Sequence, residues 1–258
     1  MCRHLAYIGP SRSLASVLYA PEQSLEKQSH RPRFQRDGAI NADGWGVGWW
    51  DPDIRPEPAR YRTAVPMWAD HSFRSVAEVV HAGAFTAAVR NATPPSPIVD
   101  TGNAPFASGA WLFSLNGFVV GFRGPVGEAL RRQVSEERAI GLDGTSDAEV
   151  LFALVLDALD AGASPEDALA GVIADAAGAR TDDRLNLLLS DGHVIVGTTW
   201  GNSLFTLQGT GLATGGVLVA SEPLDDDEGW APVPERSIVR ASCVDLDVSP
   251  LASHGGPP

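Results

Sequence analysis

Alternating apolar and polar positions, the pattern of a half-buried strand, mark the first part of the chain. Residues 1–9 (MCRHLAYIG) predict a short strand that ends in a Gly-Pro turn. Residues 41–50 (NADGWGVGWW) predict a turn that leads into a buried, aromatic-rich strand. Residues 111–122 (WLFSLNGFVVGF) predict two strands joined through Asn116-Gly117, because Asn-Gly is favoured in tight hairpin turns.

Helical spacing replaces this alternation in the middle of the chain. Residues 146–159 (SDAEVLFALVLDAL) and 165–176 (PEDALAGVIADA) predict two buried helices, each with acidic residues near its start, where they suit a helix N-terminus. The strand pattern returns in four later segments, residues 185–200, 202–208, 216–221 and 237–248. Antiparallel strands on both sides of a helical block predict an α+β layered fold, in contrast to a doubly wound parallel sheet.

Length and composition favour a single globular domain. The chain has 258 residues, of which 44% are hydrophobic, and no internal repeat or linker-like segment divides it. We expect one domain over residues 2–248, with Met1 removed. Residues 249–258 (SPLASHGGPP) are rich in Ser, Pro and Gly, so we expect them to form a flexible tail.

The net charge of the chain indicates which kinds of binding partner to expect. With 19 Lys and Arg against 32 Asp and Glu, the formal net charge is −13, and the basic residues form no cluster able to neutralise phosphates. The first residues lack the apolar core of a signal peptide, and no segment approaches the roughly 20 apolar residues that span a membrane. We therefore expect a cytoplasmic protein that acts on a small molecule and binds neither nucleic acid nor membrane. A homo-oligomer is compatible with the sequence but is not required by it.

Two cysteines occur in the chain, Cys2 and Cys243, so a disulfide framework is not indicated. Cys243 lies in a strand-like segment, and we expect it to be a small core residue without chemistry. Cys2 differs because removal of Met1 would leave a thiol and a free α-amine on one residue. An α-amine has an ordinary pKa of about 8 and a thiol one of about 8.5, so the amine can accept the thiol proton near neutral pH. Position alone, however, describes a small strand residue equally well.

Four further segments bear on Cys2 because of their order along the chain. They are NADGWGVG (41–48), VRNAT (89–93), SLNG (114–117) and TSDAE (145–149). Taken singly, the motifs have structural explanations: Asp-Gly and Asn-Gly as turn pairs, the arginine as a surface charge, the aspartate as a helix-capping acid. Taken together with Cys2, they resemble the class II glutamine amidotransferases, which use an N-terminal cysteine nucleophile.

The resemblance implies the fold of an N-terminal-nucleophile hydrolase, a four-layer αββα sandwich of two antiparallel sheets covered by helices, with Cys2 at the tip of the first strand. It extends over nearly the whole chain. Residues 65–77, 198–204 and 219–235 are similar to segments of the amidohydrolases of the ergothioneine pathway, which remove glutamate from γ-glutamyl-hercynylcysteine sulfoxide. The implied reaction is hydrolysis of a γ-glutamyl amide through a glutamyl thioester.

The same resemblance implies the catalytic groups. The thiol of Cys2 is the nucleophile, and its α-amine is the base. The side-chain amide of Asn116 and the backbone N–H of Gly117 form the oxyanion hole, an arrangement worth roughly 3–4 kcal/mol of transition-state stabilisation per donor. The segment that contains Asp43 and Gly44 lies near the nucleophile in the family, which implies that its backbone supports the α-amine.

Substrate recognition is implied by the same motifs. Arg90 grips the α-carboxylate of the glutamyl group, which a guanidinium can meet with two hydrogen bonds, and Thr93 lies beside it. Asp147 binds the α-ammonium. The chain departs from the family at two positions, because Leu115 replaces the usual His before Asn-Gly and Asn91 replaces an aromatic residue after the arginine. Neither position supplies a donor in the implied scheme.

No metal or organic cofactor is expected, because the six His residues have no ligand spacing with Cys or carboxylates. Two other functions stay open at the level of sequence. One is a glutaminase subunit that passes ammonia to a separate partner. The other is a non-catalytic γ-glutamyl-binding protein that does not need Cys2.

Overall fold

Two antiparallel β-sheets form the centre of the fold in the computed structural model, which describes residues 2–35, 38, 40–93, 96–177 and 182–251. The strands of the first sheet are β1 (Arg3–Ser13), β2 (Trp45–Trp49), β3 (Ala59–Thr63), β4 (His81–Val89), β9 (Phe205–Gln208), β10 (Val217–Ala220) and β11 (Ala231–Pro232). They lie in the order β11-β9-β10-β1-β4-β2-β3, so that β1 is the central strand.

The second sheet contains the remaining strands. They are β5 (Phe106–Ser108), β6 (Trp111–Phe118), β7 (Arg184–Ser190), β8 (Ile195–Thr198), β12 (Ser237–Ala241) and β13 (Leu246–Pro250). Their order in space is β13-β12-β8-β7-β6-β5.

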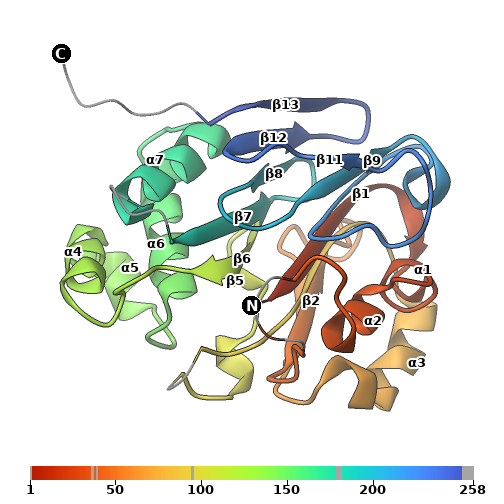
Figure 1. The fold of residues 1–258 in the computed structure, drawn as a ribbon, viewed down its shortest axis with the longest axis horizontal. Coiled ribbons are helices and arrows are strands. Elements are labelled where there is room, and N and C mark those ends of the chain that lie inside the picture. Colours follow the sequence, from red (N-terminus) through yellow and green to blue (C-terminus); the bar gives the residue numbers. More distant parts are fainter. Residues whose placement is uncertain (1, 36–37, 39, 94–95, 178–181, 252–258) are drawn as a thin grey trace.

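Helices cover the outer face of each sheet (Figure 1). The first sheet is covered by α1 (Ala15–Leu18), α2 (Leu25–His30) and α3 (His71–Val79). The second packs against α4 (Pro125–Gln133), α6 (Asp147–Asp160) and α7 (Pro165–Ala177), and α5 (Glu136–Ile140) lies against α6. Short 3-10 turns are η1 (Met67–Ala69), η2 (Asp100–Gly102) and η3 (Gly211–Ala213). The predicted four-layer αββα sandwich is confirmed.

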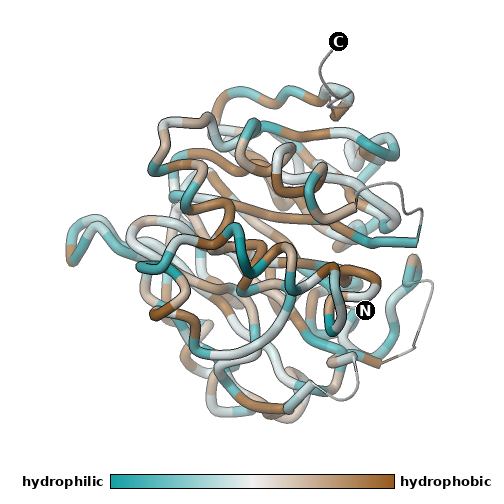
Figure 2. The backbone as a smooth tube through the Cα atoms, turned by 90° about the vertical axis from the view of Figure 1, so that its left-hand side faces the viewer, coloured by the Kyte–Doolittle hydropathy of each residue, from teal (hydrophilic) through white to brown (hydrophobic). Residues whose placement is uncertain are grey.

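Alternation along β1 explains how one strand serves two cores. Leu5 and Tyr7 pack into the core between the first sheet and its helices, whereas Ala6 and Ile8 pack into the core between the two sheets. Figure 2 shows the result, with hydrophobic stretches mostly inside the molecule and hydrophilic ones towards its periphery. In the part of the chain that the structure describes, no helix is both long and apolar enough to cross a membrane.

The helices of the central segment confirm the predicted spacing. Ser146 caps α6 in a capping box, because its hydroxyl accepts from the backbone N–H of Glu149 and the Glu149 carboxylate accepts from the Ser146 backbone N–H. All residues from 148 to 156 are buried. This cap fixes the start of the helix, and therefore the position of Asp147, against the second sheet.

The predicted hairpin at residues 111–122 is wrong. β6 runs without interruption through Asn116-Gly117 to Phe118 and pairs with β7 over this whole stretch. Gly117 is required for a different reason, because a Cβ atom there would overlap the carbonyl oxygen of Arg184 on the neighbouring strand. The glycine thus permits close approach of two strands and makes no turn.

The C-terminal strand segment also differs from its prediction. Residues 237–248 contain both β12 and most of β13, and the turn between these strands exposes Cys243. The expectation that Cys243 is a core residue is therefore wrong. Ser249 and Pro250 complete β13, so the strand takes in the first two residues of the predicted tail. Met1 and residues 252–258 lie outside the described residues.

Candidate active site

Three strand ends of the first sheet bring together motifs that are far apart in the sequence. β4 lies between β1 and β2, and Val89 pairs with the first residue of both. The residues just beyond this row are Cys2, Arg90 and Gly44, and the backbone N–H of Arg90 donates to the Gly44 carbonyl at 2.8 Å. Cys2 and the arginine motif therefore lie at the same edge of the sheet.

The second sheet supplies the opposite wall. Gly117 lies near the end of β6, and Asp147 is the first residue of α6. One carboxylate oxygen of Asp147 accepts from the backbone N–H of Val119 at 2.9 Å, and the other accepts from that of Ala148, also at 2.9 Å. These contacts fasten the helix start to the segment that follows β6.

A cavity of about 440 Å³ lies between these two walls. Five of the predicted site residues are among those that line it, namely Cys2, Arg90, Thr93, Gly117 and Asp147. The side chain of Cys2 is half-buried and carries a free thiol. The structure therefore places a thiol, a cation and a carboxylate around one space that is large enough for an amino-acid group.

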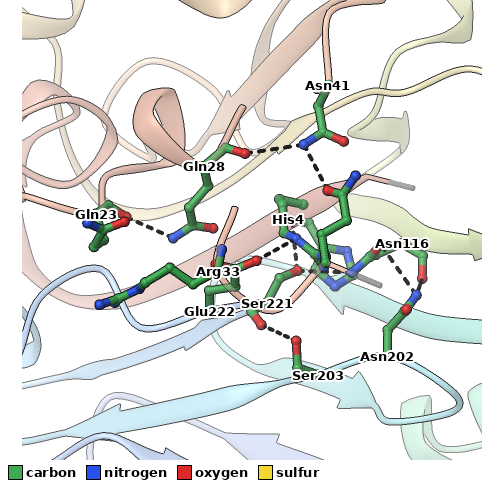
Figure 3. A network of polar contacts seen from close by, with 12 residues as sticks. His4, Gln23, Gln28, Arg33, Asn41, Asn116, Asn202, Ser203, Ser221 and Glu222 are labelled. Atoms are coloured by element: carbon green, nitrogen blue, oxygen red, sulfur yellow. Dashed lines mark hydrogen bonds and ion pairs between the residues drawn. The ribbon is translucent and has the colours of Figure 1, made fainter. Parts of the chain in front are cut away.

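Asn116 is fully buried and lies next to Cys2. When its amide is oriented to satisfy its neighbours, Nδ2 donates to the backbone carbonyl of Cys2 at 2.5 Å, and Oδ1 accepts from Arg3 Nη1 at 3.1 Å and from Ser221 Oγ at 3.2 Å. Figure 3 shows this side chain among the polar groups that lie beside β1. Asn116 is not among the residues that line the cavity, and its amide contacts Cys2 through the Cys2 backbone carbonyl.

Charge around the cavity is of both signs. Burial raises the pKa of Asp147, while the hydrogen bonds from the backbone N–H groups of Val119 and Ala148 and the nearby charge of Arg90 act in the opposite direction. The guanidinium of Arg90 donates from Nη1 to the carbonyl of Pro97 at 3.0 Å and packs against Gly102. An ammonium group near Asp147 and a carboxylate near Arg90 would each find an opposite charge.

Asp43 and Gly44 hold the loop that carries the arginine motif. The Asp43 carboxylate accepts from the backbone N–H of Ala92 at 2.7 Å, and its own backbone N–H donates to the Arg90 carbonyl at 3.0 Å. Gly44 has φ +113°, and a Cβ atom there would overlap the side chain of Asn103. Neither residue is among those that line the cavity. Both shape the wall on which Arg90 and Thr93 lie.

A buried polar layer beside Cys2 is absent from the sequence prediction. Arg3, Glu222 and His4 have no exposed surface. His4 Nδ1 lies 3.1 Å from Ser114 Oγ, and burial, with a smaller effect of the Arg3 charge, lowers the pKa of His4 to about 3. Alternation along the first strand places His4 on the same face as Cys2, but no local pattern indicates its polar partners. Across the described residues, no group of three His, Cys, Asp or Glu side chains could hold a metal ion.

Comparison with known proteins gives full-length matches. The chain is 37% identical over 257 residues to the γ-glutamyl-hercynylcysteine sulfoxide hydrolase of Mycobacterium tuberculosis, a match that covers 100% of both chains. It is 37% identical over 251 residues to the protein of the same name from Mycolicibacterium smegmatis, covering 97% of this chain and 100% of the relative. No family model matches the chain.

Solved structures match the fold. A glutamine aminotransferase class-II domain protein from Silicibacter pomeroyi superposes with a TM-score of 0.71 at 25% identity, over 98% of this chain and 100% of the other. The glutamine phosphoribosylpyrophosphate amidotransferase of B. subtilis gives a TM-score of 0.69 at 14% identity, over 97% of this chain and 49% of that longer one. At this low identity, the second match bears on the fold alone.

Proposed function

The chain belongs to the family of the γ-glutamyl-hercynylcysteine sulfoxide hydrolases, and we propose that it removes glutamate from this substrate in ergothioneine biosynthesis with Cys2 as the nucleophile. The observation that carries the residue assignment is the single cavity lined by Cys2, Arg90 and Asp147. The protein acts in the cytoplasm on a small molecule, as a single domain over residues 2–248 with Met1 removed.

The glutamyl end of the substrate lies between the two charged walls. Arg90 pairs with the α-carboxylate and Asp147 with the α-ammonium, so both ends of an amino acid are recognised. Thr93 lies on the same wall as Arg90 and contributes a hydroxyl. This pairing directs the γ-carbonyl towards Cys2 and explains why a γ-glutamyl amide is chosen over an ordinary peptide bond.

Chemistry begins when the α-amine of Cys2 takes the thiol proton and the thiolate attacks the γ-carbonyl carbon. The oxyanion accepts hydrogen bonds from the Gly117 backbone N–H and the Asn116 amide. The tetrahedral intermediate expels hercynylcysteine sulfoxide as the C–N bond breaks, and the ammonium of Cys2 gives its proton to the leaving nitrogen. Water, deprotonated by the same amine, then hydrolyses the glutamyl thioester, which releases glutamate and restores the thiol.

The test uses the purified full chain, with intact-mass measurement to verify that Met1 is absent. Glutamate release is measured separately with γ-glutamyl-hercynylcysteine sulfoxide and with L-glutamine. We expect a higher kcat/KM for the sulfoxide. A preference for glutamine that increases when a partner protein is added would instead identify an ammonia-supplying subunit.

Cys2→Ala separates catalysis from binding. We expect glutamate release to fall to background, while the variant still binds the substrate in calorimetry because the charged walls are intact. Hydrolysis at the wild-type rate by Cys2→Ala would refute the nucleophile. Binding by the wild type with no hydrolysis in either form would identify a binding protein.

A further inference from the structure

Two charged side chains without exposed surface lie next to the nucleophile. Arg3 follows Cys2 in the chain, and its Nε lies 2.8 Å from Glu222 Oε1. Burial lowers the pKa of Arg3, while the charge of Glu222 raises it. A buried ion pair is costly to desolvate and is often no more stabilising than apolar side chains of the same volume. Stability alone therefore does not account for a guanidinium at this position.

Glu222 is held in place by hydrogen bonds that do not involve Arg3. Its Oε2 accepts from the backbone N–H of Arg33 at 2.6 Å. The preceding residue, Ser221, is fastened to the first strand, because the Ser221 backbone N–H donates to the His4 carbonyl at 2.9 Å and the His4 backbone N–H donates to Ser221 Oγ at 3.0 Å. Figure 3 shows these groups close together. These hydrogen bonds hold the Glu222 carboxylate in place beside the Arg3 guanidinium.

The other end of the guanidinium reaches Asn116. Arg3 Nη1 lies 3.1 Å from Asn116 Oδ1 when Asn116 Nδ2 faces the Cys2 carbonyl. The oxygen and nitrogen of an amide have nearly the same shape, so only hydrogen-bond partners decide which way the group faces. A reversed amide would place its NH₂ group against the guanidinium, where two donors meet with no acceptor.

The Cys2 carbonyl can only accept, so it favours the same orientation as Arg3, whereas the remaining neighbours of Asn116 do not require it. The Ser221 hydroxyl can donate or accept, so it suits either orientation of the amide. Asn202 Nδ2 donates to the backbone carbonyl of Asn116 at 2.9 Å. It also lies 3.5 Å from the amide atom of Asn116 that faces Cys2, a longer contact than the 2.5 Å from that atom to the Cys2 carbonyl. A guanidinium carries donors and no acceptor, and it therefore selects one orientation.

We propose that Arg3, held by Glu222, is a positioning residue that orients the Asn116 amide so that its NH₂ group faces the reaction centre. One N–H of this group goes to the Cys2 carbonyl, and the other donates to the oxyanion of the γ-carbonyl. The inference rests on the proposed function, since it assigns a task within that reaction. It gives the ion pair a role in the rate of thioester formation and none in substrate affinity.

The test compares four proteins: the wild type, Arg3→Met/Glu222→Leu, Asn116→Ala and the triple variant. Removing both charges together avoids an unpaired buried ion, so we expect the double variant to fold. Circular dichroism checks folding, and intact mass checks that Met1 is removed in each protein. Arg3→Lys is the matched control, because it keeps the charge for Glu222 but lacks the planar fork that reaches Asn116 as well.

We expect kcat for glutamate release by the double variant to fall by about 10-fold or more, with KM within about 3-fold of wild type, because one oxyanion donor is misdirected. Arg3→Lys falls in the same direction. The triple variant should be no slower than Asn116→Ala by more than about 2-fold, since the ion pair has no target once the amide is gone. A double variant with wild-type kcat, or effects that multiply in the triple variant, would overturn the proposal.

Two further readouts separate this inference from the proposed function. All four proteins are also assayed with L-glutamine, so a wild type that hydrolyses only glutamine refutes the sulfoxide substrate and leaves the comparison intact. Hydrogen exchange of the Asn116 side-chain amide, followed by ¹H–¹⁵N spectroscopy, needs no activity at all. We expect exchange at least about 10-fold faster in the double variant than in the wild type, and equal rates would refute the orienting contact.

Discussion

Asp147→Asn tests the ammonium-binding assignment with almost no change in shape. Both carboxylate oxygens of Asp147 accept backbone hydrogen bonds, from Val119 and from Ala148. Asparagine has one oxygen, so one of these N–H groups must face an NH₂ group. The substitution also removes the negative charge that would pair with the substrate α-ammonium. One variant therefore makes two separable predictions, one for stability and one for binding.

The two effects have similar free energies but appear in different measurements. Loss of one acceptor beside a backbone N–H should lower the free energy of unfolding by about 1–3 kcal/mol. Loss of a hydrogen bond between charged groups costs about 1.5–3 kcal/mol of binding, which corresponds to a KM roughly 10- to 150-fold higher. We expect kcat to change much less, because in the proposed scheme Asp147 contacts the glutamyl ammonium and not the reacting carbon.

The pKa of Asp147 adds a dependence on pH. Burial raises this pKa above 3.8, so between the two values the folded protein holds a proton that the unfolded chain has lost. Ionisation of Asp147 therefore reduces stability as the pH rises through this window. Binding of the ammonium needs the ionised form, so kcat/KM should rise with pH through the same window. Asp147→Asn should lose this acid limb.

Urea unfolding and steady-state kinetics measure the two effects, and Asp183→Asn is the matched control. Asp183 is a buried carboxylate that accepts from the backbone N–H of Val120 at 2.6 Å but is not among the residues that line the cavity. We expect Asp183→Asn to be destabilised with an unchanged KM. Equal KM values for Asp147→Asn and wild type would refute the reasoning, whatever the stability.

Three other substitutions test separate parts of the structure. Arg90→Met should raise KM for γ-glutamyl substrates by about 10-fold or more through loss of the carboxylate partner, and an unchanged KM would exclude this role. Gly117→Ala should unfold at markedly lower urea, because its Cβ would overlap the Arg184 carbonyl; wild-type stability would contradict the close strand contact. The pKa of His4 is lowered from 6.5 to about 3, so the folded state favours the neutral imidazole. The resulting contribution to stability is complete above pH 6.5 and is lost as the pH falls towards 3. His4→Asn should therefore lose less stability than wild type between pH 6.5 and 4 in urea titrations, and parallel pH profiles would contradict this expectation.

Elements whose signals are local were predictable from sequence. The apolar run and the Ser-x-x-Glu cap of α6 lie within one segment, so both the helix and the place of Asp147 at its start follow from the sequence. Asn116-Gly117 has an equally local signal, but an Asn-Gly pair can occur either in a tight turn or where two strands approach closely. Only the carbonyl of Arg184 on the neighbouring strand distinguishes the two.

The site itself required the family resemblance. Periodicity and composition alone give Cys2 no advantage over an ordinary strand residue, because the groups around it come from different sheets. The Arg3–Glu222 pair shows the limit most clearly. Its two members lie at opposite ends of the chain, and an arginine in a strand segment usually indicates exposure. The burial of Arg3 follows from the central position of β1 in its sheet, which no local sequence pattern indicates.

That central position has a practical consequence for anyone who produces the protein. Chain termini are usually the parts that best tolerate tags and fusion partners. Here β1 is paired on one side with β10 and on the other with β4, so its beginning is as tightly constrained as the middle of a sheet. An affinity tag placed ahead of Cys2 would convert its α-amine into an amide, and in the proposed mechanism this leaves no base for the thiol. Tags belong after β13, which is an edge strand.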